Sequence, residues 1–278
     1  MYGTHQSLAG RSGNFVLPTL TVGELGKKAT QTSNPLALAV RGFYLHLFDV
    51  NISTSDFYQD YVYTYVERDL RQLKNIGNLT DFQRFMQLLA GRVGQLVNTS
   101  SLASDVGVDH KTINSWLTVL EASYLIFRLA PYFVNFGKRV VKSPKIYFYD
   151  TGLLCFLLGI NSAAELKNHY SVGSFFENFV IADYWKNCLN VRSTEKLYFW
   201  RDNKGNEVDL LIDNAGKQIP VEIKAGKTFN SEMLKGVEYF NALRKVKGGG
   251  FLVYNGDVEM TVKGNKIQNW KNFNPSKI

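Results

Sequence analysis

Cysteine is scarce in this chain, and histidine shows no metal-binding pattern. Only Cys155 and Cys188 occur among 278 residues, and both stand in apolar segments with helical spacing. This favours buried, reduced thiols over a disulfide framework. The four histidines are scattered without the spacing of a zinc site. The sequence therefore predicts a cytoplasmic protein that uses neither disulfides nor structural zinc.

Long apolar runs and a leader sequence are also lacking. The N-terminal residues are polar, which does not fit a signal peptide. No apolar run approaches the ~20 residues that a membrane-spanning helix needs, so we expect a soluble protein with no membrane partner. The net charge of +8 suits nucleic acid as a partner, although many basic proteins bind none.

A nucleotide-binding P-loop is absent as well. The pattern Gly-x4-Gly-Lys-(Ser/Thr) occurs nowhere, and the nearest sequence, residues 23–28, has the wrong spacing. It also lacks the hydroxyl that would hold Mg²⁺. We therefore expect no ATP site in this chain and no ATP hydrolysis by it alone.

A predicted β-hairpin near the C-terminus carries the most informative residues. Residues 208–212 and 219–223 alternate apolar and polar side chains, and 213–216 are turn-forming. With a four-residue loop, Asp209 faces Pro220 and Glu207 faces Glu222. Glu207, Asp209, Glu222 and Lys224 then share one face of the sheet, and a slip of one residue would separate them.

This combination suits metal-dependent hydrolysis of a phosphodiester. Mg²⁺ or Mn²⁺ takes oxygen ligands, often only one or two carboxylates with water and phosphate. Asp209 and Glu222 are the predicted ligands, and Lys224 would orient the attacking water or offset negative charge. The alternative is that Glu222 and Lys224 form an ordinary ion pair, since Glu-x-Lys also occurs at residues 165–167.

Asp209 and the Glu222-x-Lys224 triplet, preceded by Glu177 on a predicted helix over 174–189, resemble the PD-(D/E)XK nuclease superfamily. The resemblance implies catalytic roles for Glu177, Asp209, Glu222 and Lys224, with Glu177 as a further metal ligand. Glu177 is otherwise explained as a first-turn glutamate that is favourable to the helix dipole.

The order of several phrases also resembles prokaryotic AAA-type ATPases that end in a nuclease-like domain. The phrases are Ser7-Leu8-Ala9-Gly10-Arg11, Tyr65-Val66-Glu67-Arg68-Asp69-Leu70, Leu120-Glu121-Ala122-Ser123-Tyr124-Leu125, Lys142-Ser143-Pro144-Lys145, Asp150-Thr151-Gly152-Leu153-Leu154, Phe199-Trp200-Arg201-Asp202 and Pro220-Val221-Glu222-Ile223-Lys224-Ala225-Gly226. Because the P-loop is missing, the chain resembles the C-terminal two-thirds of such a protein.

The middle of the chain predicts a winged helix-turn-helix. Residues 100–106 form a short helix, 107–109 a turn, and 110–122 a second helix capped by Asp109, followed by two wing strands over 124–130 and 145–149. The first residues of such a second helix contact base edges, and a basic wing contacts phosphates. The candidate DNA-binding residues are Lys111, Thr112, Asn114 and Ser115 on the helix and Lys138, Arg139 and Lys142 in the wing. Winged helices also dock proteins, so this alternative stays open.

The predicted fold is α plus α/β, with three parts. Residues 1–50 are a remnant of an ATPase module with one helix around 35–49, 51–160 a helical winged-helix-type domain, and 161–278 a PD-(D/E)XK (restriction-endonuclease-like) α/β domain. A protein partner or a homo-oligomer formed through the N-terminal remnant is a further expectation. The functional alternatives are a metal-dependent nuclease and a non-catalytic binding module whose nuclease-like fold is inert.

Overall fold

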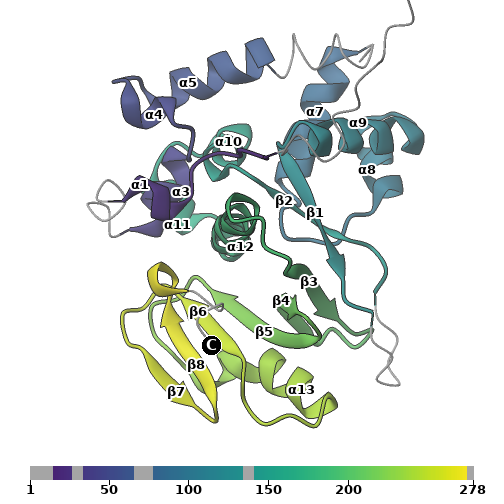
Figure 1. The fold of residues 1–278 in the computed structure, drawn as a ribbon. Helices are drawn as coiled ribbons and strands as arrows, with labels where there is room; N and C mark the ends of the chain where they lie inside the picture. The colour runs from purple at the N-terminus through teal and green to yellow at the C-terminus, as the bar shows by residue number, and fades with distance from the viewer. Residues whose placement is uncertain (1–14, 27–33, 66–77, 134–140, 274–278) are drawn as a thin grey trace, which may run out of the picture.

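A computed structural model describes residues 15–26, 34–65, 78–133 and 141–273 (Figure 1). It is a mixed α/β structure built around an eight-stranded sheet. The predicted wing residues Lys138 and Arg139 lie outside the described residues, as do the phrase at residues 7–11 and most of the phrase at 65–70.

The helices precede, interrupt and cover the sheet. They are α1 (Val22–Leu25), α3 (Pro35–Arg41), α4 (His46–Asp49), α5 (Thr54–Tyr61), α7 (Leu79–Ala90), α8 (Thr99–Val106), α9 (His110–Ala122), α10 (Thr151–Leu157), α11 (Ala163–Asn168), α12 (Val172–Asn190) and α13 (Lys235–Leu243). Short 3-10 turns run over Ser231–Leu234 and Trp270–Asn272. The strands are β1 (Ile126–Pro131), β2 (Lys145–Phe148), β3 (Lys196–Arg201), β4 (Glu207–Asn214), β5 (Lys217–Lys224), β6 (Phe251–Tyr254), β7 (Met260–Val262) and β8 (Asn265–Asn269).

The sheet has the order β2-β1-β3-β4-β5-β6-β8-β7 and mixes parallel and antiparallel pairs. The two predicted wing strands pair antiparallel, as expected. However, β1 also pairs in parallel with β3, through Ala130 with Tyr198 and Pro131 with Phe199. The two predicted wing strands are therefore part of the same sheet as the predicted nuclease hairpin.

Helix α12 packs on one face of the sheet and α13 on the other (Figure 1). Buried residues lie all around α12, because it is enclosed by the sheet and by α3 and α10. On the opposite face, Phe240 of α13 packs with Trp200, Val208 and Leu211. Strands β4 and β5 are thus covered on both sides, and their polar side chains are drawn into the interior.

The helix-turn-helix elements lie where the sequence predicts them. Asp109 caps α9 by accepting hydrogen bonds from the backbone N–H groups of Lys111 at 2.7 Å and Thr112 at 2.8 Å. The helix buries Ile113, Trp116, Leu117, Val119 and Leu120. Turn and helix boundaries are therefore encoded locally, by capping and apolar spacing.

The predicted register of the β4–β5 hairpin is wrong by two residues. Only Ala215 and Gly216 form the loop; both have positive φ, 50° and 90°, as a type I′ turn requires. Asn214 consequently pairs with Lys217, and Leu211 rather than Asp209 pairs with Pro220. Because side chains alternate with a period of two, this even shift alone changes the face of no side chain. However, β4 has one extra residue between Val208 and Leu211, which both pack against α13. Glu207 therefore contacts Lys145, whereas Glu222 lies against Gly236 of α13 on the other face.

Two further expectations differ from the structure. The single helix expected around 35–49 is two helices, α3 and α4, because α3 ends at Gly42 and the following N–H of Phe43 donates to the buried carboxylate of Asp150 at 2.7 Å. Strands β7 and β8 were not predicted, since their sequence lacks a clear apolar alternation.

Both cysteines are free and buried, in agreement with the sequence prediction. In the part of the chain that the structure describes, no helix combines the length and apolar character needed to cross a membrane.

Candidate functional site

Asp209 occupies an irregularity of strand β4. Tyr198 pairs with Leu211 and Trp200 with Val208, so β4 has one more residue than β3 between these pairs. Such a bulge bends the strand and redirects side chains. The ladder to β5 runs from Asn214–Lys217 to Leu210–Val221.

Beyond the end of this ladder, the side chain of Asp209 accepts a backbone hydrogen bond from β5. Its Oδ2 accepts a hydrogen bond from the backbone N–H of Ile223 at 2.8 Å. The side chain of Lys224 approaches the same oxygen, with its Nζ at 3.1 Å. The bulge therefore aims the aspartate along the sheet, toward the end of β5.

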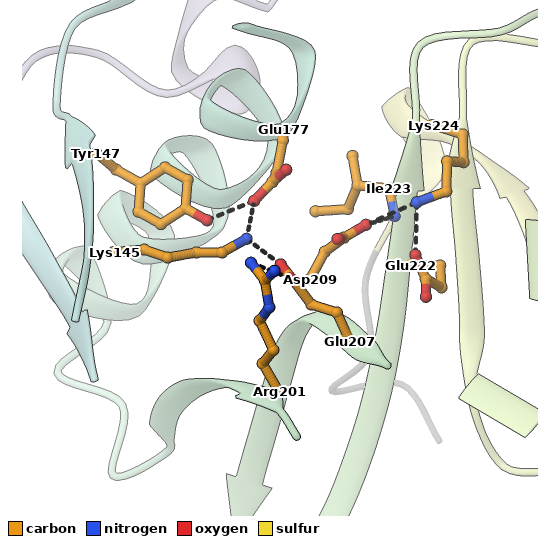
Figure 2. Close-up of polar contacts among 9 residues, drawn as sticks. All are labelled: Lys145, Tyr147, Glu177, Arg201, Glu207, Asp209, Glu222, Ile223 and Lys224. Carbon is orange, nitrogen blue, oxygen red and sulfur yellow. Dashed lines mark hydrogen bonds and ion pairs between the residues drawn. The ribbon is translucent and has the colours of Figure 1, made fainter. Parts of the chain in front are cut away.

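Asp209 and Glu222 form a buried acid pair, the name used below for these two residues. Lys224 Nζ lies 2.6 Å from Glu222 Oε2 and bridges both carboxylates (Figure 2). Side-chain exposure is 11% for Asp209 and 7% for Glu222, but 38% for Lys224. Lys224 is therefore the most exposed side chain of this trio.

The acid pair has opposed pKa shifts. Burial, and then repulsion from Asp209, raise the pKa of Glu222 well above its usual value, and Lys224 offsets only part of this. Burial alone would raise the pKa of Asp209, but the charges of Lys224 and Lys145 outweigh it and hold the pKa low. The fold therefore favours ionisation of Asp209 and disfavours that of Glu222.

A second group of side chains, the Lys145 cluster, adjoins the acid pair and consists of Lys145, Tyr147, Glu177 and Glu207. Lys145 Nζ lies 3.0 Å from Glu177 Oε1 and also contacts Glu207 Oε1. Tyr147 donates its hydroxyl to the same Glu177 oxygen at 2.5 Å. Figure 2 shows Asp209 and Glu207, both from β4, between the Lys145 side and the Lys224 side.

Lys145 is charged although it is buried. Burial would lower its pKa, but Glu177 and the neighbouring acids outweigh this effect and raise it. Burial raises the pKa of Glu177, and the ammonium group of Lys145 offsets part of that rise. Arg201 Nη1 adds a further contact, 3.3 Å from Glu207 Oε2.

Helix α13 approaches the acid pair closely at Gly236. A Cβ on this residue would lie 1.9 Å from Glu222 Oε1 and 2.1 Å from the carbonyl oxygen of Glu207. Only glycine fits such a contact without displacing the helix or the glutamate. The start of α13 thus closes one side of the site.

The structure brings Asp209, Glu222 and Lys224 together, and places Glu177 on Lys145 and Tyr147 instead. Within the described ranges, no set of three His, Cys, Asp or Glu side chains is arranged to hold a metal ion. The acid pair alone has the oxygen donors that Mg²⁺ or Mn²⁺ prefers. The raised pKa of Glu222 means that added positive charge would be stabilised there, so these donors fit a divalent cation.

Lys145, Tyr147, Arg201 and Gly236 were given no role by sequence reasoning. A signal existed for Lys145, a lysine that opens an otherwise apolar strand, because buried lysines are nearly always paired. No local pattern identifies Gly236, since its importance comes from contact with residues on other strands.

The predicted DNA-binding side chains are partly available. Lys111, Asn114, Ser115 and Lys142 are exposed, whereas Thr112 is half-buried. The Thr112 hydroxyl donates to Asp109 Oδ2 at 3.0 Å, so its first role is in capping. The segment that leads into β2 contacts the sheet where the Val141 N–H donates to the Arg201 carbonyl at 3.2 Å.

Two family models match separate parts of the chain. Residues 36–164 match a domain of unknown function, DUF8612, and residues 172–273 match another domain of unknown function, DUF4143. The acid pair, Lys224 and Glu177 lie within the second match, and the helix-turn-helix within the first.

Similar proteins are uncharacterised. Rv2008c of Mycobacterium tuberculosis and Mb2031c of Mycobacterium bovis are each 33% identical over 225 residues, which are 80% of this chain and 49% of the relative. MJ1637 of Methanocaldococcus jannaschii is 28% identical over 221 residues, which are 76% of this chain and 43% of the relative. The chain therefore spans about half the length of the curated relatives it matches. No solved structure matches it significantly.

Proposed function

We propose that this chain is a nucleic-acid-binding protein with a divalent-cation-dependent phosphodiesterase site, built on a PD-(D/E)XK-type core. The observation that carries the proposal is the acid pair. Two buried carboxylates meet beside a half-exposed lysine, and one of them has a strongly raised pKa. Perturbed acids with a specific charge partner are typical of functional sites.

Asp209 and Glu222 would hold Mg²⁺ or Mn²⁺. When bound, the cation would polarise a phosphoryl oxygen and lower the pKa of a water molecule. Asp209 contributes a carboxylate whose pKa is already low, so it is ready to bind a cation. Glu222 would bind the cation as a carboxylate, because the cation would supply positive charge beside an acid whose ionisation is disfavoured by burial and by Asp209.

Lys224 has two roles in the proposal. It balances the acid pair from the solvent side, since its Nζ contacts both carboxylates. Its amine would also offer a donor to a phosphate oxygen or to the attacking water. Glu177 and Lys145 act behind the pair as positioning residues.

The winged helix would bind the nucleic acid. Lys142 stands three residues before Lys145, so their Cα atoms lie within about 11 Å of each other even if that segment is fully extended. A phosphate backbone held by Lys142 therefore runs near the acid pair. Lys111 and Asn114, exposed at the start of α9, would contact the duplex further away.

The resemblance to AAA-type ATPases adds context to the proposal. No ATPase activity is proposed for this chain, which has no P-loop. In a longer protein of that kind, ATP hydrolysis would move or load the nucleic acid on which this site acts.

A cleavage assay tests the proposal. Purified protein is incubated with supercoiled plasmid and with a single-stranded oligonucleotide, in Mg²⁺, Mn²⁺ or EDTA. Cleavage is expected with a divalent cation and not in EDTA, and Asp209→Asn should reduce the rate at least ~100-fold, as loss of a central electrostatic group does. The control is Asp60→Asn, at an exposed position on α5, which should match the wild type. Equal cleavage by Asp209→Asn would reject the site.

A non-catalytic binding module is the second candidate. It is favoured by the ion pairs, because Glu177, Glu207, Asp209 and Glu222 all contact Lys145 or Lys224. In that case Mn²⁺ should leave the melting temperature unchanged. A genuine site instead adds about 2.7 kcal/mol at a cation concentration of 100 times Kd.

A further inference from the structure

The Lys145 cluster contains an unusual arrangement: one ammonium group between two carboxylates from different elements. Glu177 comes from α12 and Glu207 from β4, and Nζ of Lys145 contacts an oxygen of each. The lysine side chain is only 4% exposed. It also lies under an aromatic ring, with Nζ 5.5 Å from the centroid of Phe199. The charge is therefore fixed in place and shielded from solvent.

This position is one that a metal ion could occupy. Two carboxylate oxygens from separate elements converge on a single point, and each is within hydrogen-bond distance of it. A movement of about 1 Å by the Glu177 oxygen would reach the 2.0–2.1 Å distance of Mg²⁺ coordination, and the Glu207 oxygen lies closer still. In two-metal sites the ions are about 3.5–4 Å apart. Asp209 lies between Lys145 and the side chains of Glu222 and Lys224 (Figure 2).

The charges of the whole site agree with a single added cation. Four carboxylates, of Glu177, Glu207, Asp209 and Glu222, meet three basic groups, of Lys145, Arg201 and Lys224. One divalent ion at the acid pair would leave the site with a net charge of plus one, which attracts a phosphodiester. A second divalent ion would have to displace the ammonium group of Lys145.

We propose that Lys145 is a built-in substitute for a second metal ion. It neutralises Glu177 and Glu207, keeps Glu177 away from the acid pair, and limits the site to one divalent cation. This inference rests on the proposed function, since it assumes that the acid pair binds a cation. Lys145 is a positioning residue here, because it acts through the two glutamates.

Counting bound Mn²⁺ tests the inference. Free Mn²⁺ is measured by electron paramagnetic resonance while the full chain, first stripped with chelator, is titrated. The wild type should bind one ion, and Lys145→Met should bind two. Asp209→Asn should bind none, and Asp209→Asn with Lys145→Met should bind one, at Glu177 and Glu207. Lys145→Met with Glu177→Gln should return to one ion.

Lys167→Met is the matched control, since Lys167 is exposed on α11, and it should bind one ion. A second readout is thermal melting. Without metal, Lys145→Met should melt below the wild type, because two buried carboxylates lose their partner; saturating Mn²⁺ should raise its melting temperature more than that of the wild type. A structural role alone gives no such rescue.

The outcomes separate the two proposals. One ion in both the wild type and Lys145→Met overturns this inference and leaves the proposed function intact, as do two ions in the wild type. No ion in either protein overturns the proposed function and this inference with it. If Lys145→Met is unfolded without metal, folding on addition of Mn²⁺ supports the inference, and remaining unfolded at saturating Mn²⁺ overturns it.

Discussion

At the scale of single residues, the protein keeps several charges where water cannot stabilise them. Asp209 and Glu222 are buried on β4 and β5, and Lys145 is buried beside them. Each such charge costs free energy unless it is paired. This cost is the physical reason to regard the cluster as functional, because a purely structural core would be more stable with apolar residues.

The raised pKa of Glu222 makes stability depend on pH. Folding lifts this pKa above the usual 4.5, so the folded state binds the proton more tightly than the unfolded state. The resulting loss of stability is absent below about pH 4.5, grows as pH rises toward the folded-state pKa, and is complete above it. A folded-state pKa that is higher by one corresponds to about 1.4 kcal/mol.

Replacing Glu222 by glutamine should remove this loss of stability. In EDTA, raising the pH above 4.5 should lower the melting temperature of Glu222→Gln less than that of the wild type. The expected difference is roughly 2–4 °C for each kcal/mol of stability that the wild type loses. Glu232→Gln, at an exposed position, should follow the wild type. Parallel curves for wild type and Glu222→Gln would mean that the Glu222 carboxylate is not destabilised by the fold.

Gly236 is predicted to be essential for the closure of the site by α13. In Gly236→Ala the new Cβ would overlap Glu222 and the Glu207 carbonyl, so we expect a loss of about 1–3 kcal/mol, as for other overpacked positions, and weaker cation binding. The control is Gly173→Ala on α12, where nothing lies within 4 Å of the added Cβ. Denaturant unfolding of both variants gives the comparison, and unchanged stability of Gly236→Ala would contradict the packing described.

At the scale of elements, local signals were sufficient for most helices and strands, but not for β7 and β8 or for the exact connections. The caps and apolar spacing of α8 and α9 were sufficient to predict these two helices from the sequence. The sequence also predicts strands β4 and β5, but Asp213 and Asn214, which favour turns, predict a loop of four residues. Positive φ at Ala215 could not be foreseen, and it moved the register by two residues.

The bulge at Asp209 could not be predicted from a local sequence pattern. It depends on how β3 pairs with β4, and it decides where the carboxylate points. The partnership of Glu177 with Lys145 likewise joins α12 to β2. Contacts between elements distant in sequence therefore determined the parts of the site that sequence reasoning missed.

The helix α9 and the wing should act as phosphate-binding elements. Lys111→Ala and Lys142→Ala are each expected to weaken DNA binding about equally for all sequences, and to reduce the slope of log K against log salt by about 1. Lys167→Ala is the control on an unrelated exposed helix. Fluorescence anisotropy at several salt concentrations measures the slopes; values identical to the wild type would exclude these lysines from the interface.

At the scale of the whole molecule, one sheet crosses the boundary that the sequence placed at residues 160 and 161. Strand β1 pairs with β3, and the largest apolar core contains Leu129 and Phe148 together with Val221 and Ile223. The parts before and after residue 160 thus share both hydrogen bonds and buried surface. The acid pair depends on this shared sheet, because the charge of Lys145, on β2, helps to keep the pKa of Asp209 low.

We therefore expect the chain to unfold as one unit. Calorimetry should show a single transition whose calorimetric and van't Hoff enthalpies agree, and Lys145→Met should lower that whole transition. Two well-separated transitions would contradict a shared core, if substitutions at Asp209 shift only one of them.

The central claim is that Asp209 and Glu222 hold one divalent cation. Its most direct test is an anomalous difference map from a crystal grown with MnCl₂, with Asp209→Asn crystals as the control. We predict one peak in contact with the carboxylates of Asp209 and Glu222, absent from Asp209→Asn, with Lys145 still on Glu177. An empty acid pair at saturating Mn²⁺, or a peak that persists in Asp209→Asn, would contradict the account.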